Sequence, residues 1–251
     1  MTAAASEAVL YTFLLFCRIG GCLMLMPGFS SPRIPMQFRL FIAMASTLVM
    51  SPVLLPALKT SVPDLAPPIV AGLILSETAT GALIGLMGRF FFLALQFMAT
   101  AVTQFVGFAP MPGAPIDDTE PLPAMAALIT VTATVLFFLT DQHWEVFRAL
   151  LASYTVLPVG EQYSIQTSLI QLTSALGDAF VLALQISAPF MIYALLINFL
   201  FGIANKMIPQ IPIYFISLPF VFAGGVLLFY FTIGEFLTLF SSGFAAWLLK
   251  G

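Results

Sequence analysis

Charged residues are scarce in this sequence. Of its 251 residues only eight are Lys or Arg and eleven are Asp or Glu, so charge makes up 8% of the chain, against about 25% in soluble globular domains. Apolar residues make up 61%, and the mean hydropathy is +1.07. A soluble fold of this length could not bury that much apolar surface. The same numbers exclude disorder, which needs low hydrophobicity, and nucleic-acid binding, which needs a basic surface. The chain is therefore predicted to be an integral membrane protein.

Residues that carry enzyme chemistry or bind metals are also few. The chain has one histidine, His143, and two cysteines, Cys17 and Cys22, which are expected to pack in an apolar helix. No G-x-S-x-G elbow, H-E-x-x-H pair or P-loop occurs, so neither an enzyme nor a cofactor is predicted. His143 fits an interfacial position better than an acid–base role. The acidic residues of one proline-rich loop fit solvation better than cation binding; they are Asp117, Asp118 and Glu120.

Long uncharged runs take the place of the missing charge. They cover residues 40–58, 90–116, 121–140, 179–205 and 207–234, and a membrane-crossing helix needs about 20 apolar residues. Period-two alternation is missing, which excludes an outer-membrane β-barrel. The predicted fold is all-α, a polytopic helical membrane protein. Arg18 is the first basic residue and lies inside the first apolar run, so no cleaved signal peptide is expected. Basic residues nearly balance between the two sides, which leaves the orientation open.

Proline and glycine divide the chain into helices. Breaks are expected at 27–35, 63–68, 110–123, 158–160 and 209–212. Residues 69–108 contain no proline, and as one helix they would be about 60 Å long, roughly twice the hydrocarbon thickness. They form either a bent pair of helices or one long helix. The pattern P-x-I-P-x-x-F occurs at 32–38 and 209–215, which indicates either two similar helix starts or a repeated hairpin module.

Five charged residues lie inside the predicted membrane helices, where desolvation is costly. They are Arg18, Glu77, Arg89, Asp178 and Glu235. Glu77 and Arg89 are twelve residues apart on one helix, too far for pairing between neighbouring turns. Each therefore needs a partner on another helix or another subunit. Such charges either hold helices together as ion pairs or line a wet pore or a subunit seam.

Small and flexible residues indicate where helices pack. Gly81 and Gly85 form a G-x-x-x-G motif followed by Gly88, which favours close approach of two helix backbones. Asn198 and Gly202 indicate a second packing face, with the Asn198 amide expected to bond across a helix contact. Methionine suits irregular or changing contacts. Three methionines therefore either fill gaps or form a deformable seal across a conduit, and they are Met24, Met26 and Met111.

Four groups of residues occur in a characteristic order. They are Arg18 with the break after Pro27; Glu77, Gly81 and Gly85; Asp141-Gln142-His143 followed by Pro158-Val159-Gly160; and Pro209-Gln210 leading to Phe215 and Pro219. Over essentially its whole length the chain resembles the flagellar biosynthetic protein FliR family and its counterparts in type III secretion injectisomes. Gln142 departs from the usual glycine of that family, and Ile211-Pro212 departs from a Met-Asn or Leu-Asn pair.

The resemblance implies a subunit of the type III protein export gate in the bacterial inner membrane, at a flagellar basal body or an injectisome base. Implied partners are FliP-like and FliQ-like gate subunits, other membrane proteins of the export apparatus, unfolded export substrates and membrane lipid. In the family, long kinked helical hairpins assemble into a helical pore complex. A FliP-like part, residues 1–160 here, is joined to a FliQ-like C-terminal hairpin, residues 161–251.

The resemblance also implies a loop that plugs the closed pore, and by position this loop maps to about residues 108–122. The expected plug and seal residues are Phe108, Met111, Pro112, Gly113, Met24 and Met26, and Pro209 and Gln210 form the turn before the last helix. The alternative function is a small-molecule or ion transporter, in which broken helices and buried charges bind substrate near the bilayer midplane.

Overall fold

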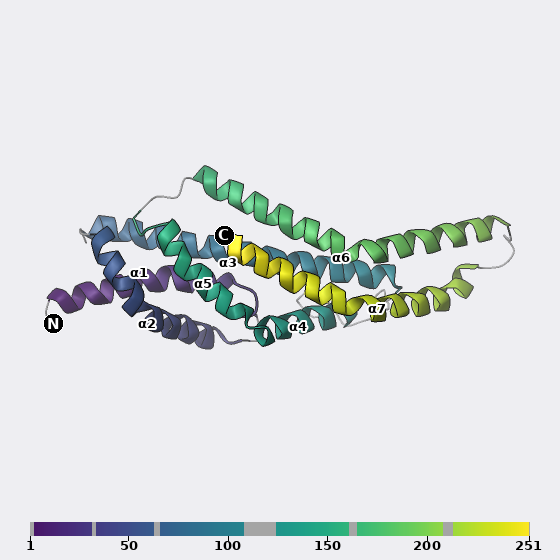
Figure 1. Cartoon of the computed structure of the whole chain (residues 1–251), viewed down its shortest axis with the longest axis horizontal. Coiled ribbons are helices and arrows are strands. Elements are labelled where there is room, and N and C mark those ends of the chain that lie inside the picture. The colour runs from purple at the N-terminus through teal and green to yellow at the C-terminus, as the bar shows by residue number, and fades with distance from the viewer. Residues whose placement is uncertain are drawn as a thin grey trace. The chain divides into compact units, whose positions relative to one another are not determined.

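The chain folds entirely into helices over the residues that the computed structural model describes, which are 3–31, 34–62, 66–107, 124–160, 165–207 and 213–250. This part of the chain holds seven helices and no strand (Figure 1). The helices are α1 (Ala3–Leu25), α2 (Met36–Ser61), α3 (Pro67–Phe105), α4 (Ala124–Leu139), α5 (Gln142–Val156), α6 (Ile165–Met207) and α7 (Ile213–Lys250). The predicted all-α class is confirmed, and α1, α2, α3, α5 and α6 each end shortly before a predicted break, whereas α4 ends at Leu139, outside those breaks.

Several helices are much longer than a bilayer is thick. α3 is one continuous helix of 39 residues, which decides between the two predictions made for this segment. At 1.5 Å per residue it is about 58 Å long, and α6, with 43 residues, is about 65 Å long. Within the described residues, five helices are long and apolar enough to cross a membrane, and α4 with α5 would add a sixth if the pair forms one broken span. The prediction of a polytopic membrane protein is confirmed.

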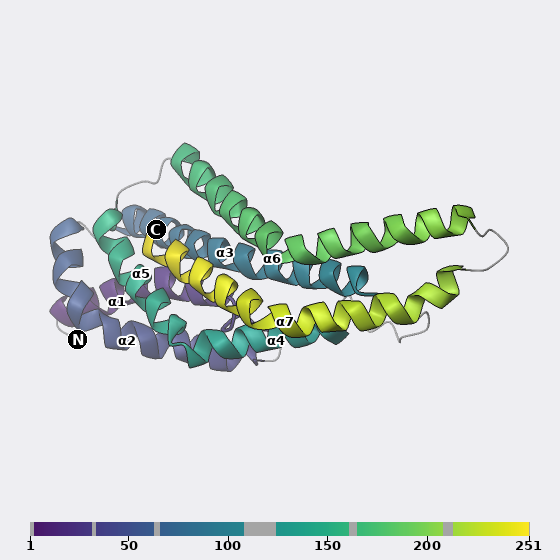
Figure 2. The ribbon, with the colours of Figure 1, turned by 45° about the vertical axis from the view of Figure 1, so that its right-hand side comes forward.

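Prolines lie inside three of these helices, at Pro52 and Pro56 in α2, Pro189 in α6 and Pro219 in α7. A proline cannot donate to the carbonyl four residues earlier. At Pro52 this carbonyl belongs to Leu48, and the hydroxyl of Ser51 donates to it instead at 2.9 Å. The last turns of α2 change direction in both views (Figures 1 and 2). The prolines therefore bend α2, and the carbonyl of Leu48, which loses its main-chain donor, is hydrogen-bonded by Ser51 instead.

The chain divides into two compact units, each built from separate stretches. Unit 1 comprises Met1–Phe91, Thr140–Gly177 and Trp247–Gly251, and unit 2 comprises Phe92–Leu139 and Asp178–Ala246. The division at residue 160 into FliP-like and FliQ-like parts concerns relationship to other subunits, and it stays a prediction. In unit 1, α1 packs against α2, and the buried Tyr11 hydroxyl on α1 donates to the carbonyl of Val62 at the end of α2, 2.8 Å away.

Unit 2 is centred on aromatic side chains. The Phe92 ring lies 5.2–6.1 Å from three other phenylalanine rings, with near-perpendicular planes, an arrangement that aromatic pairs favour. Those rings belong to Phe137, Phe240 and Phe244. Within this unit α6 and α7 run side by side in opposite directions (Figures 1 and 2). Tyr193 on α6 donates to the carbonyl of Val221 on α7 at 2.8 Å.

Candidate functional site: a buried ion pair between three helices

Helices α1 and α3 are in backbone contact within unit 1. A Cβ atom at Gly81 would overlap the carbonyl oxygen of Arg18, and one at Gly85 would overlap that of Cys22. From the other side, a Cβ at Gly21 would lie 2.8 Å from the carbonyl oxygen of Thr78. Only glycine permits an approach this close. Because Gly81 lies one helical turn after Glu77, the contact also brings the side chain of Glu77 beside α1.

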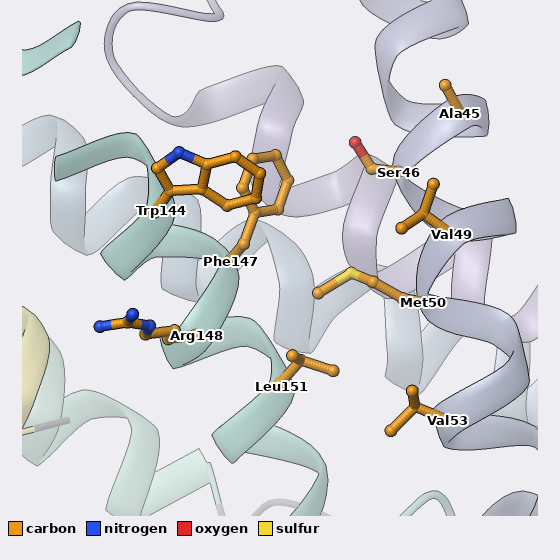
Figure 3. A pocket seen from close by; sticks show the side chains of 9 residues that line it. All are labelled: Ala45, Ser46, Val49, Met50, Val53, Trp144, Phe147, Arg148 and Leu151. Atoms are coloured by element: carbon orange, nitrogen blue, oxygen red, sulfur yellow. The ribbon is translucent and has the colours of Figure 1, made fainter. Parts of the chain in front are cut away.

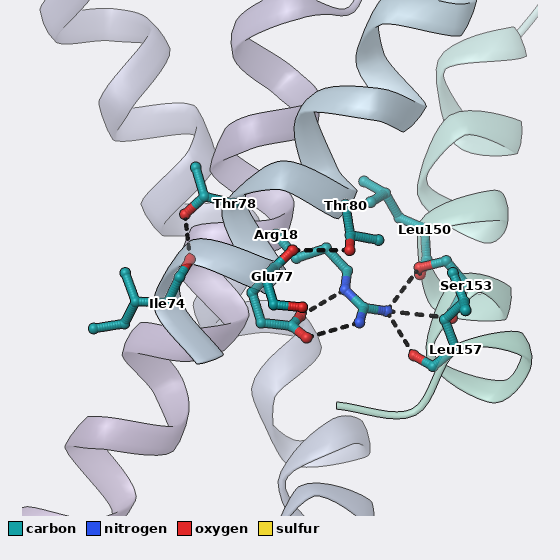
Figure 4. Close-up of polar contacts among 9 residues, drawn as sticks. Arg18, Ile74, Glu77, Thr78, Thr80, Leu150, Ser153 and Leu157 are labelled. Atoms are coloured by element: carbon teal, nitrogen blue, oxygen red, sulfur yellow. Dashed lines mark hydrogen bonds and ion pairs between the residues drawn. The ribbon is translucent and has the colours of Figure 1, made fainter. Parts of the chain in front are cut away.

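Arg18 and Glu77 form a two-point ion pair at this crossing (Figure 4). Arg18 Nε donates to Glu77 Oε2 at 2.6 Å, and Nη2 donates to Oε1 at 2.9 Å. Each residue is only 1% exposed. The parallel bonds match the fork of a guanidinium to the two oxygens of a carboxylate, which is the strongest geometry for such a pair. The pair compensates for the removal of both charges from solvent.

The third nitrogen of Arg18 reaches α5. Nη1 donates to the carbonyls of Leu157 at 3.0 Å and Ser153 at 3.2 Å, and it lies 3.4 Å from the Ser153 hydroxyl. These carbonyls lie at the C-terminal end of α5, which is the negative end of the helix dipole. The Ser153 carbonyl also accepts from the N–H of Leu157 at 2.9 Å. Arg18 Cζ also lies 4.1 Å from the centre of the Tyr154 ring, a cation–π contact. One side chain of α1 therefore joins α3 and the end of α5.

The chemistry of this site is positional. The carboxylate of Glu77 accepts two bonds from Arg18, so it is held as an ion pair rather than as an open acid or base. The Tyr154 hydroxyl is buried and has no hydrogen-bond partner among the described residues. No group of three or more His, Cys, Asp or Glu in that same part of the chain could hold a metal ion. The arrangement fixes three helices relative to one another.

The other three charges predicted inside membrane helices lie elsewhere. Arg89, Asp178 and Glu235 are exposed. The two ion pairs found within the described ranges are Arg18–Glu77 and an exposed pair on α5, Arg148–Glu145. Contact of Arg89, Asp178 and Glu235 with other subunits therefore stays a prediction.

Asn198 and Gly202, predicted on a second packing face of α6, are both exposed among the described residues. Asn198 is exposed, and its amide donates to the carbonyl of Ala194 at 2.8 Å, one turn back on the same helix. The bond that was predicted across a helix contact is therefore formed inside α6. A Cβ at Gly202 would meet no described atom within 4 Å. Asn and Gly on a helix surface have the same local pattern whether the face is packed or open.

The predicted plug and seal residues are only partly described. Met26 is fully buried, and a Cβ at Gly88 would lie 2.6 Å from its sulfur, so Met26 fills the space beside a glycine of α3. Met24 is half-buried. Phe108, Met111, Pro112 and Gly113 of the predicted plug, and the predicted turn residues Pro209 and Gln210, lie outside the described residues.

The turn before α5 explains one departure from the family pattern. Asp141 has a φ of 57°, in the left-handed region, while Gln142 is the first residue of the helix and is buried. Asp is one of the few residues other than glycine that adopts this conformation readily. A glycine at position 142 is therefore not needed for this turn. His143, next in sequence, is half-buried with its ring 5.5 Å from that of Trp144.

Several residues of the site carried no recognised signal in the sequence. Ser153 and Leu157 act mainly through main-chain carbonyls, which any residue provides, and Gly21 was one of many glycines. Tyr154 had a usable signal, because Gln142, Val146, Leu150 and Tyr154 are buried at four-residue spacing on α5. That spacing predicts the buried face of the helix, although it does not predict what lies opposite.

Known proteins resemble this chain over nearly its whole length. The family model described as bacterial export proteins, family 1, matches residues 9–247. The flagellar biosynthetic protein FliR of Caulobacter vibrioides is 24% identical, over 87% of this chain and 87% of its own. FliR of Escherichia coli is 24% identical, over 80% of this chain and 75% of its own. FliR of Aquifex aeolicus is 25% identical to this chain, and the alignment covers 91% of this chain and 87% of that protein.

Proposed function

Because this chain belongs to the bacterial export proteins, family 1, we propose that it is an integral-membrane component of a flagellar type III export apparatus. The family match from residue 9 to residue 247 is the observation that carries this proposal, since it includes part or all of every helix. The relatives named FliR support the flagellar system in particular, because the alignments cover at least three quarters of each. The apolar helices support a place in the bacterial inner membrane.

Within that apparatus the chain would serve as a subunit of the export gate, together with FliP-like and FliQ-like proteins. Its uncovered apolar surface supports this role. Large apolar side chains are strongly exposed along α6 and α7, among them Leu195 at 70% and Phe231 at 70%. α6 is about 65 Å long, whereas the hydrocarbon layer is about 30 Å thick. Lipid alone cannot cover an apolar helix of that length, so other subunits are expected to cover part of it.

Co-purification tests the assembly. The tagged chain is produced alone, with the FliP-like and FliQ-like proteins of the same organism, or with an unrelated membrane protein as the control. A gate subunit is expected to be stable and abundant only with its own partners and to elute with them. A chain that purifies well alone, and does not bind those partners, would instead support the transporter.

The loop at about residues 108–122 would plug the closed gate, with Phe108, Met111, Pro112 and Gly113 in the plug and Met24 beside the conduit. The five prolines and one glycine at 110–123 support an irregular loop rather than a helix. Replacing residues 111–119 by a shorter linker is expected to make the membrane leak ions, measured as loss of membrane potential in cells with an assembled complex. A linker of the original length and composition, with its order scrambled, is the control for disturbed assembly. Unchanged leakage in an assembled complex would contradict the plug.

A further inference from the structure

A groove of about 450 Å³ opens between α2 and α5 in unit 1 (Figure 3). Its walls are mostly hydrocarbon, with Val49, Met50 and Val53 on α2 facing Phe147 and Leu151 on α5. Val49 is 78% exposed and Val53 is 70% exposed, so the groove is open. α2 is a candidate membrane span and α5 is half of the broken one. The groove therefore opens on surfaces that are expected to meet lipid.

The polar groups of the groove lie at one end and along its α5 side, where Arg148 lies between the levels of Trp144 and Leu151 (Figure 3). Ser46 and Trp144 lie at the end nearer the start of α5, and Val53 and Leu151 lie at the other end (Figure 3). Trp144 is 58% exposed, and exposed tryptophan is typical of the boundary between hydrocarbon and headgroups. A ligand that matches this lining has one polar end and one long apolar part.

Arg148 supplies the charge at the groove. Its side chain is 74% exposed, and Nη1 donates to Glu145 Oε1 at 2.6 Å. No other hydrogen bond of Arg148 occurs within the described part of the chain, and a guanidinium has five N–H donors. The remaining donors can bind a phosphate at two points. Since Glu145 already balances the charge of Arg148, the match is to a phosphate whose headgroup carries a compensating positive charge.

The size of the groove favours a narrow occupant. On α2 the lining runs from residue 45 to residue 53, which is about 12 Å of helix. A partner helix is about 10 Å across, so only one face of it could enter the open groove. A single acyl chain is much narrower than a helix. We propose that the groove binds a phospholipid, with an acyl chain between α2 and α5 and the headgroup phosphate at Arg148.

Photolabelling of the assembled complex in detergent tests this site. The probe is a phosphatidylethanolamine with a diazirine in its acyl chain, and the labelled residues are identified by mass spectrometry. Label is expected on residues 45–53 and 144–151, well above the level on the more exposed stretch 195–199 of α6. Arg148→Gln is expected to lower groove labelling about tenfold, the value of a charged hydrogen bond. It should reduce labelling to the level of a diacylglycerol that carries the same diazirine chain.

Matched variants separate binding from general lipid contact. Lys206→Gln removes an exposed cation of α6 outside the groove and should leave groove labelling unchanged. Val49→Phe narrows the groove and should lower labelling, whereas Leu48→Phe, at an exposed neighbour that does not line it, should not. Equal labelling of the groove and of α6, or undiminished labelling in Arg148→Gln, would overturn the proposal. A groove that is unlabelled in the complex because a partner polypeptide covers it would also overturn it.

Discussion

Replacing Glu77 with glutamine is predicted to destabilise the chain strongly. Gln keeps the size of the side chain and one oxygen acceptor, but it leaves the Arg18 charge buried at 1% exposure without its counter-ion. The carbonyls of Ser153 and Leu157 and the ring of Tyr154 remain beside the guanidinium. These neutral groups only partly replace a carboxylate bonded at 2.6 and 2.9 Å.

The expected magnitude follows from the burial. Breaking a buried ion pair by removing one partner costs about 3–5 kcal/mol of unfolding free energy, because the other charge stays desolvated. Arg18→Met should cost a similar amount, since it also removes the cation–π contact, worth about 0.5–2 kcal/mol, and the donor to the end of α5. Replacing both residues, as Arg18→Met with Glu77→Leu, should cost less than the sum of the single changes, because no charge is left buried.

The assay is thermal unfolding of the purified complex, with each variant compared in a double-mutant cycle. Glu7→Gln is the matched control, because Glu7 is exposed and makes no ion pair within the described residues. The control should melt like the original protein. If Glu77→Gln melted like the control, or if the two single changes simply added in the double variant, Arg18 and Glu77 would not be coupled and the reasoning would be refuted.

Three further changes test the helix contacts and the turn by the same melting assay. Gly81→Ala should lower stability by about 1–3 kcal/mol through overpacking, whereas Gly72→Ala, with open space around it, should raise it slightly. Gly225→Ala should lower stability, because its new Cβ would overlap Val106 in unit 2, whereas Gly234→Ala should not, because no described atom lies near it. Equal effects of these two substitutions on melting would contradict the close contact at Gly225. Asp141→Ile should cost about 1–2 kcal/mol at its positive φ, and Asp141→Gly should cost little; the reverse order would contradict the turn.

The positions of the helices could be predicted from sequence because their signals are local. Apolar runs about 20 residues or longer set the helices, and clusters of proline set the breaks. The prolines at 63–68 illustrate the limit of that rule, because Pro67 is the first residue of α3, where its missing N–H has no cost. The length of α3 could be predicted from the run without proline at 69–108. That run did not predict whether the segment is one helix or a bent pair.

The partner of Arg18 could not be predicted in the same way. The same local signal, a charge inside an apolar run, occurs at Arg18, Glu77, Arg89, Asp178 and Glu235. Of these five residues, Arg18 and Glu77 are the two that are buried together. The pairing depends on a contact across 59 residues of sequence. The close backbone approach of α1 and α3 at Gly81 fixes the pairing. A glycine in a helix indicates that another helix packs closely there, but it does not indicate which helix.

Secretion is the most direct measurement of the central claim, that this chain is a component of flagellar protein export. The gene is deleted in its own organism, and flagellar hook and filament proteins are measured in the culture medium and in the cells. The predicted result is that these proteins are made but not exported, that export returns with the intact gene, and that Glu77→Gln restores it poorly while Glu7→Gln restores it fully. Normal export of hook and filament proteins from the deletion strain would contradict the claim.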